Sequence, residues 1–454
     1  MKYLPFRHVG AISIDGRVFI FALALSCLTG VLFGLAPALS TRNQIIDPLK
    51  EGAGRGLTSV GGNRLRHALV AGEVALALIV LAGAALMIDS MSRLLGVNPG
   101  LNPKNVLTMD VSTTQENLYV GPPTDEQFCQ QLTQRLGAIP GVVSVGAVSH
   151  LPIAGGSAGR GFTIEGRPEP KQEPGGGYGV ACPNFFRTMG IPMVEGREFT
   201  DADTVNSADV VVMNEAMAHR FWPNGGALGA HIKLGAYNDD TPWMTVVGIV
   251  ADFRHDGLDA KPRPYFYRPF TQAGWPVMAV VIRTASAPAS YEKSARVALA
   301  QMSGNYPASN VLTMEQIVSD SLGSRRFPTM LLGAFASLAL ILSAVGIAGV
   351  VGYSVAQRTH EIGIRMALGA QPRDVLRLVL GGSMAWTFVG VAIGIAGALG
   401  LTRLLGNLLY GVQPADPFIL SATAALLLLV AFAACYIPAR RAMRVDPMVA
   451  LRYE

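Results

Sequence analysis

Few residues in this chain have the types and spacing that catalysis requires. Residues 155–159 read Gly-Gly-Ser-Ala-Gly and match the G-x-S-x-G pattern of a nucleophile elbow, in which the serine stands on a sharp turn between a strand and a helix. Here the following residues 160–166, Arg-Gly-Phe-Thr-Ile-Glu-Gly, are typical of a strand rather than a helix. The context therefore predicts a loop and no catalytic nucleophile.

Patterns that bind metals or nucleotides are also missing from the sequence. His219, His231 and His255 lack the spacing of metal ligands. The cysteines form no C-x-x-C pair and are Cys27, Cys129, Cys182 and Cys435. The phosphate-binding pattern G-x-x-x-x-G-K-[S/T] does not occur. We therefore predict that this chain is not an enzyme, with no catalytic residue, no metal and no cofactor.

The most informative pattern lies in residues 357–375. Residues 358–368 are predicted to form a short helix, because Gly369 is a natural C-terminal stop and Pro372 suits the first turn of a following helix. This short helix directly follows a long apolar stretch.

The predicted short helix is amphipathic. Glu361 and Arg365 are spaced i, i+4 and are expected to pair, whereas Ile362, Met366 and Leu368 are expected to form an apolar side. Two interpretations stay open on this pattern alone. The helix either lies on a lipid surface or docks into the groove of a partner protein.

The elements that position this helix are long apolar stretches. A helix needs about 20 mostly apolar residues to cross the ~30 Å hydrocarbon core of a bilayer. Five stretches qualify: Val18–Leu39, Leu69–Ile88, Pro328–Val355, Leu378–Thr402 and Pro417–Ile437. The sequence therefore predicts an α-helical membrane protein with about five transmembrane helices and a large α/β (α+β) domain, residues 93–326, inserted between the second and third helices.

The basic residues predict the orientation of these helices. The loops 40–68 and 356–377 and the C-terminal tail share one side of the membrane, and together they carry more Lys and Arg than the opposite side. Lys and Arg favour the cytoplasmic side, so we expect a multi-pass protein of the plasma (inner) membrane with an extracytoplasmic insert. The net charge of +5 fits such loops and predicts no nucleic-acid partner.

One alternative concerns the first apolar stretch, which could be a cleaved signal peptide because Ala36-Pro37-Ala38 resembles a cleavage site. Its apolar run is longer than the roughly 7–15 residues of a signal peptide, which favours a transmembrane helix. If the insert is extracytoplasmic, Cys129 and Cys182 could form a disulfide, and their spacing leaves this open.

The insert is predicted to mix strands and helices. Strands are expected at Val142–Val148, Gly161–Glu165, Val210–Met213, Met244–Val250 and Val277–Ile282. Helices are expected at Asp125–Leu136, Asn214–Phe221 and Tyr291–Met302. Pro and Gly clusters near residues 166–177 suggest two subdomains. The aromatic runs Tyr265–Tyr267 and Phe221-Trp222 are interpreted as core residues.

These segments together resemble the MacB/FtsX-type ABC-transporter permeases. The pattern R-x-x-E-I-G-I-R-x-A-L-G-A, from Arg358 to Ala370, is the hallmark cytoplasmic segment of that family, and residues 438–452 are a second hallmark. Residues 184–192, Asn-Phe-Phe-Arg-Thr-Met-Gly-Ile-Pro, are similar to the family's periplasmic core domain. The resemblance covers almost the whole chain.

The resemblance implies a division into domains. Residues 64–92 would be the first transmembrane helix of a module, residues 93–326 a MacB-like periplasmic core domain with two subdomains, and residues 327–454 an FtsX-like permease domain with three transmembrane helices. Residues 1–63 would be the last helix and cytoplasmic linker of a preceding module. The reason is a repeated ending: Ala36-Pro37-Ala38 is followed by Asp47-Pro48, much as Pro438-Ala439 is followed by Asp446-Pro447 near the C-terminus. The chain is thus expected to be a fragment of a two-module permease.

The resemblance also implies function and partners. The chain would be the permease subunit of an ABC transporter and would couple a separate cytoplasmic ATPase to movement of its periplasmic domain for export or efflux. An alternative is a membrane-anchored mechanotransmission or signalling protein that regulates an extracytoplasmic partner without moving cargo. Further expected partners are membrane lipids, a second copy or another permease module, and a periplasmic adaptor. The ATPase-coupling residues would be Arg358, Glu361, Ile362, Gly363, Arg365, Ala367, Leu368 and Gly369.

Overall fold

The described part of the chain falls into two compact units. The computed structural model describes residues 16, 20, 23, 24, 60–113, 126–156, 158–168, 174–236, 238–302, 306–357, 359–369, 371–405, 409–413 and 415–442. One unit, here called the helical unit, comprises Met1–Ser92 and Phe327–Glu454. The other, here called the inserted unit, comprises Arg93–Arg326.

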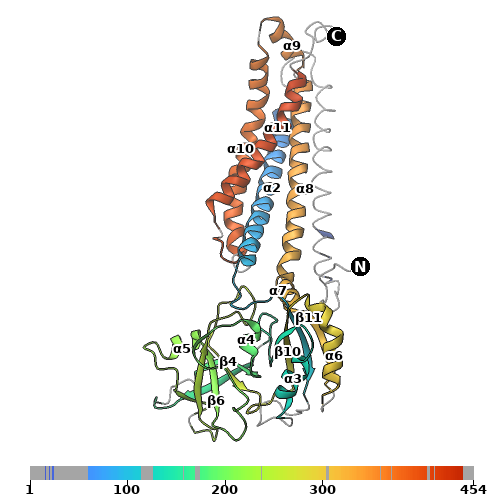
Figure 1. The fold of residues 1–454 in the computed structure, drawn as a ribbon. Helices are drawn as coiled ribbons and strands as arrows, with labels where there is room; N and C mark the ends of the chain where they lie inside the picture. The colour runs from blue at the N-terminus through green and yellow to red at the C-terminus, as the bar shows by residue number, and fades with distance from the viewer. Residues whose placement is uncertain are drawn as a thin grey trace. The chain divides into compact units, whose positions relative to one another are not determined.

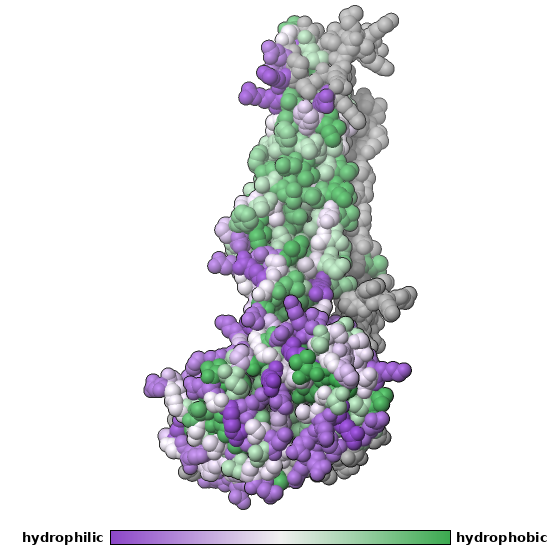
Figure 2. Space-filling view, viewed as in Figure 1, coloured by the Kyte–Doolittle hydropathy of each residue, from purple (hydrophilic) through white to green (hydrophobic). Residues whose placement is uncertain are grey.

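The helical unit is built from long apolar helices (Figure 1). They are α2 (Val60–Leu95), α8 (Gly323–Gln357), α10 (Pro372–Leu405) and α11 (Pro417–Ala442). Among the described residues, four helical stretches are long and apolar enough to cross a membrane: His67–Leu95, Arg325–Ala356, Leu376–Leu401 and Pro417–Arg440. Figure 2 shows a hydrophobic surface over these helices, with hydrophilic residues gathered near the short helix α9 (Thr359–Ala367).

These four helices coincide with four of the five predicted spans. The other predicted span, Val18–Leu39, lies outside the described residues apart from isolated positions. The count of five transmembrane helices therefore stays a prediction.

Helices α2 and α10 approach closely because glycine removes side chains at their contact. A Cβ atom built at Gly390 would lie 2.6 Å from the carbonyl oxygen of Ala71, and one at Gly394 would lie 3.0 Å from that of Ala75. These glycines belong to a G-x-x-x-G pattern, which allows helix backbones to pack tightly in lipid. Tight packing of α10 on α2 follows directly from these residues.

The strands of the inserted unit pair in one eleven-stranded sheet, in the order β11-β1-β10-β2-β4-β3-β7-β8-β6-β9, with β5 beside β8. Their bounds are β1 Val106–Ser112, β2 Val142–Val148, β3 Ala158–Ile164, β4 Gly175–Ala181, β5 Met193–Gly196, β6 Val210–Asn214, β7 His231–Leu234, β8 Met244–Val250, β9 Tyr265–Pro269, β10 Val277–Thr284 and β11 Ala308–Thr313. All five predicted strands are confirmed. β4 pairs antiparallel with β3 and parallel with β9, so residues distant in sequence meet at this part of the sheet.

Short helices accompany the sheet: α3 Phe128–Gly137, α4 Phe185–Met189, α5 Glu215–Phe221, α6 Glu292–Ala300 and α7 Met314–Ser321. The three predicted helices are confirmed as α3, α5 and α6. Asn214 caps α5 by accepting the amide hydrogen of Met217. Thr313 and Gln316 form a capping box at the start of α7.

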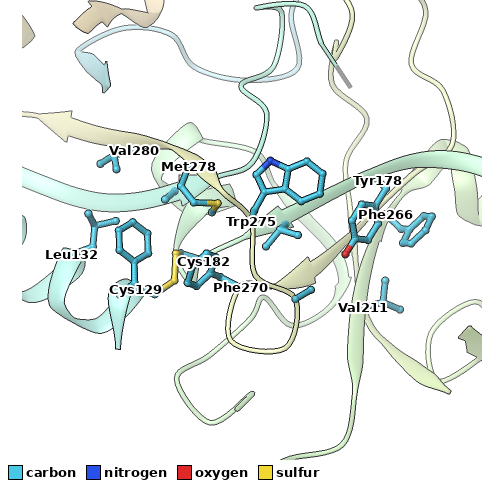
Figure 3. Packing of buried hydrophobic residues seen from close by; sticks show 14 of the residues in the cluster. Cys129, Leu132, Tyr178, Cys182, Val211, Phe266, Phe270, Trp275, Met278 and Val280 are labelled. Carbon is cyan, nitrogen blue, oxygen red and sulfur yellow. A yellow bond between two sulfur atoms is a disulfide. The ribbon is translucent and has the colours of Figure 1, made fainter. Parts of the chain in front are cut away.

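The core of the inserted unit is apolar and is cross-linked by a disulfide. Tyr265, Phe266 and Tyr267 are each at most 1% exposed, which confirms their interpretation as core residues. Cys129 of α3 is bonded to Cys182, which follows β4. Figure 3 shows this disulfide among buried side chains that include Phe270. The pairing that the sequence left open is therefore present in the fold.

Candidate coupling surface

The predicted coupling segment forms a short helix between two long ones. α8 ends at Gln357, α9 spans Thr359–Ala367, and α10 begins at Pro372. Gly369 has a φ of +94°, a left-handed conformation that glycine adopts without strain. Its amide donates to the carbonyl oxygen of Met366 at 3.1 Å. The predicted stop at Gly369 is confirmed.

The start of α10 is also fixed locally. The carboxylate of Asp374 accepts a hydrogen bond from the amide of Gln371 at 3.1 Å. An acidic side chain in the first turn satisfies an amide that the helix itself leaves unpaired and complements the helix dipole. The turn between α9 and α10 is therefore defined by glycine at one end and aspartate at the other.

One face of α9 is exposed and combines charge with apolar side chains. This face, here called the α9 stripe, consists of Glu361, Ile364, Arg365 and Leu368. These residues follow the i, i+3, i+4, i+7 spacing of a single helical face. Arg365 and Glu361 form an ion pair with an N–O distance of 2.6 Å. Ile364 is 40% exposed and Leu368 is 83% exposed.

The opposite face of α9 packs inward. Ile362 is only 2% exposed and Met366 is half-buried. The expectation that Ile362, Met366 and Leu368 share one apolar side is therefore wrong for Leu368. Leu368 comes six positions after Ile362, and with 3.6 residues per turn this spacing carries Leu368 to another face of the helix.

The sequence interpretation also missed Ile364. Its position identifies it: Ile364 comes three residues after Glu361 and four before Leu368, and residues three or four apart share one face of a helix. Of the other predicted coupling residues, Gly363 and Ala367 lie within α9, whereas Arg358 lies outside the described residues.

The α9 stripe suits binding better than internal stabilisation. An exposed i, i+4 ion pair contributes only ~0.3–0.5 kcal/mol. Leu368 leaves most of its apolar surface uncovered, so the fold gains little from it. Among the described residues, no group of three or more His, Cys, Asp or Glu side chains is placed to hold a metal. The α9 stripe thus presents uncovered apolar area beside paired charges.

Family models match both parts of the chain. The MacB-like periplasmic core domain matches residues 68–298, and the FtsX-like permease C-terminal domain matches residues 333–447.

Named relatives are ABC-transporter proteins. The pyoverdine export ATP-binding/permease protein PvdT of Pseudomonas fluorescens is 29% identical over 283 residues, covering 60% of this chain and 42% of PvdT. The macrolide export ATP-binding/permease protein MacB of Chromobacterium violaceum is 28% identical over 279 residues, covering 60% of this chain and 42% of MacB. The uncharacterized ABC transporter permease YvrN of Bacillus subtilis is 27% identical over 300 residues, covering 61% of this chain and 70% of YvrN.

The chain thus spans 42% of the length of these two PvdT and MacB relatives. The two family models cover the inserted unit and the helical unit in the order expected for a membrane permease, and four apolar helices accompany them. This chain belongs to the MacB/FtsX-type family of ABC-transporter permeases.

Proposed function

We propose that this chain is the permease subunit of an exporter and couples ATP hydrolysis by a separate cytoplasmic ATPase to movement of the inserted unit. The observation that carries the proposal is the α9 stripe, because Leu368 is 83% exposed beside an ion pair on a short helix between two long apolar helices. An amphipathic helix of this kind fits an apolar groove with a charged rim. Relatives named as export proteins support the export part of this proposal.

We place the protein in the inner membrane, with α9 in the cytoplasm and the inserted unit outside it. The disulfide between Cys129 and Cys182 supports this placement, because disulfides persist in oxidising compartments and are rare in the cytosol. In this assignment residues 93–326 are the periplasmic core domain, residues 64–92 and 327–454 form the permease module, and residues 1–63 belong to a preceding module.

Continuous helices provide a route for movement. α8 is continuous from Gly323 to Gln357, with Pro328 near its start, and in this proposal a displacement at its α9 end is carried along that helix. α10 starts at Pro372 and packs on α2 through Gly390 and Gly394. Engagement of the α9 stripe by an ATPase would therefore shift α8 and α10 together.

The test is reconstitution of the full chain in nanodiscs with a candidate P-loop ATPase subunit of the ABC type. We expect the chain to bind this ATPase and to stimulate its activity. Leu368→Glu and Glu361→Arg should each reduce binding by about tenfold or more, as loss of a central contact does at other interfaces. Glu292→Arg is the matched control, because Glu292 forms an equivalent exposed i, i+4 pair with Arg296 on α6.

Any of three results would contradict the proposal. One is binding and ATPase stimulation that are the same for the Leu368 and Glu361 variants as for the unmodified chain. Another is a topology in which Pro174 and Arg373 are labelled from the same side of intact cells. Binding of the α9 stripe to empty liposomes, with no binding to the ATPase, would identify a lipid-surface helix instead.

A further inference from the structure

A cavity of about 350 Å³ opens in the inserted unit at the centre of the sheet. Its walls come from β3, β4 and β9 and from the segments that follow β7 and precede β10. This volume lies at the small end of the ~300–1,000 Å³ typical of small-molecule sites. A ligand of one or two rings is the size that fits.

Aromatic side chains form one wall of this cavity. Tyr178 of β4 and Trp275 line it, and their ring centroids are 6.1 Å apart. Figure 3 shows the two side chains near one another, with Phe266 beside Tyr178. Both rings are about 5% exposed, so they are held firmly by the surrounding core. Such rigid aromatic surfaces favour stacking or edge contacts with a flat ligand.

Two guanidinium groups lie beside this aromatic wall. Arg160 of β3 stands over the Tyr178 ring, with its Cζ atom 5.9 Å from the ring centroid. Arg268 of β9 also lines the cavity. Burial raises the pKa of Tyr178, and the charges of Arg268 and Arg160 oppose that rise, so the hydroxyl stays protonated and able to donate at neutral pH.

Arg268 is held in place at the cavity wall. Its Nη2 donates to the carboxylate of Asp209 at 2.6 Å and to the carbonyl oxygen of Gln272 at 3.3 Å. The side chain keeps 12% of its surface exposed, so the guanidinium group presents positive charge to the cavity that it lines.

The rim of the cavity is already satisfied by internal contacts. The carboxylate of Asp239 accepts the amide hydrogen of Ala236 at 2.8 Å and closes the turn after β7. Lys233 donates to the carbonyl oxygen of Asp239 at 2.8 Å, which adds a positive charge beside that carboxylate. Of the charged side chains that line the cavity, Arg160 and Arg268 are positive and Asp239 is negative, and this balance favours an anion.

We propose that this cavity binds a small aromatic carboxylate, with its ring against Trp275 and Tyr178 and its carboxylate accepting hydrogen bonds from Arg268 and Arg160. The fork of donors on arginine matches the two oxygens of a carboxylate. The site is formed within the inserted unit alone, so the proposal does not depend on an ATPase partner.

Calorimetric titration of the full chain in nanodiscs with 2-naphthoate tests this proposal, with empty nanodiscs correcting for partition into lipid. The neutral isostere 2-naphthamide is titrated in parallel. We expect the carboxylate to bind roughly tenfold or more tightly than the amide, because hydrogen bonds to a charged group are stronger than those to a neutral one.

Variants assign the binding to the cavity. Arg160→Gln should weaken binding of 2-naphthoate by roughly tenfold. The double variant Asp209→Asn with Arg268→Gln removes both charges of the pair without leaving a lone carboxylate, and should weaken binding at least as much. Arg296→Gln on the exposed face of α6 is the matched control and should bind like the unmodified chain.

The proposal fails if 2-naphthoate gives no saturable binding, or if the amide binds as tightly as the carboxylate. It also fails if folded Arg160→Gln protein binds 2-naphthoate with unchanged affinity. Thermal unfolding of each variant establishes that it is folded. If the double variant is unfolded, Arg160→Gln decides the result, because Arg160 is a half-exposed residue whose replacement leaves the core intact.

Discussion

The guanidinium group of Arg325 lies 2.7 Å from the carboxylate of Asp259, which joins the first turn of α8 to the loop between β8 and β9. The chain that leaves α2 contacts the same loop, because the amide of Arg254 donates to the carbonyl oxygen of Pro99 at 3.0 Å. Gly100 packs there so closely that an added Cβ would lie 2.4 Å from the carbonyl oxygen of Asp252. Both connections to the helices therefore meet one loop of the inserted unit.

We predict that Asp259→Asn loosens this loop with little effect on global stability. The pair is partly exposed, so its loss should cost only about 0–1 kcal/mol. Hydrogen exchange of the amides in residues 253–260 should become faster, whereas exchange in β8 should not change. Glu292→Gln breaks a comparable ion pair on α6 and is the control. Unchanged exchange in residues 253–260 would show that the ion pair does not restrain the loop.

We predict that Gly390→Ala destabilises the helical unit. The new methyl group would overlap the carbonyl oxygen of Ala71 and the side chain of Val74, and overpacking of this kind typically costs ~1–3 kcal/mol. Gly382→Ala in the same helix meets no atom within 4 Å, and should be neutral or stabilising because alanine favours helix. Thermal unfolding in detergent compares the two. Equal shifts in melting temperature would argue against the α2–α10 contact.

We predict that the disulfide between Cys129 and Cys182 stabilises the inserted unit. The bond closes a loop of 53 positions, and removal of a native disulfide typically costs about 2–4 kcal/mol. The double variant Cys129→Ser with Cys182→Ser should therefore unfold at a lower temperature. Reductant should lower the melting temperature of the unmodified chain and leave that of the variant unchanged. A reductant effect of equal size in both proteins would exclude this role.

We predict a pH dependence of stability from Glu198. Its carboxylate accepts the amide hydrogen of Phe186 at 2.9 Å, and burial raises its pKa from 4.5 to about 7. Between these two values the folded protein holds a proton that the unfolded chain has released. Glu198 therefore supports folding most below pH 4.5, and this contribution declines as the pH rises to about 7.

The variant Glu198→Gln should remove this dependence. It should be more stable than the unmodified chain at pH 8, by up to roughly 3 kcal/mol, and close to it at pH 5. Melting temperatures measured across this range test the effect. Glu195→Gln, at an exposed position of β5, should keep the slope of the unmodified chain. An unaltered slope in Glu198→Gln would assign the pH dependence to other groups.

Local structure was largely predictable from the sequence. The expected strands Val142–Val148 and Met244–Val250 agree with β2 and β8 residue for residue, and Gly369 ends α9 as expected. Four of the predicted spans are long apolar helices. These features depend on covalent geometry and on the cost of unpaired backbone groups in lipid, and both are set by nearby residues.

The functional surfaces depend on contacts that sequence spacing does not reveal. Helical spacing already separates Leu368 from Ile362, but only packing shows that the Ile362 face is the covered one and that Leu368 stays exposed. Cys129 and Cys182 are joined because α3 and the end of β4 meet in the core. Helical periodicity defines which residues share a face, but only the neighbouring elements decide which face is covered.

The cavity illustrates the same limit over longer distances. Arg160, Tyr178 and Arg268 line it because β4 lies between β3 and β9, one neighbour antiparallel and the other parallel. Helices and strands could be predicted from neighbouring residues, because those preferences are local. Which side chains meet could not, because strand pairing and core packing depend on the free energy of the whole fold.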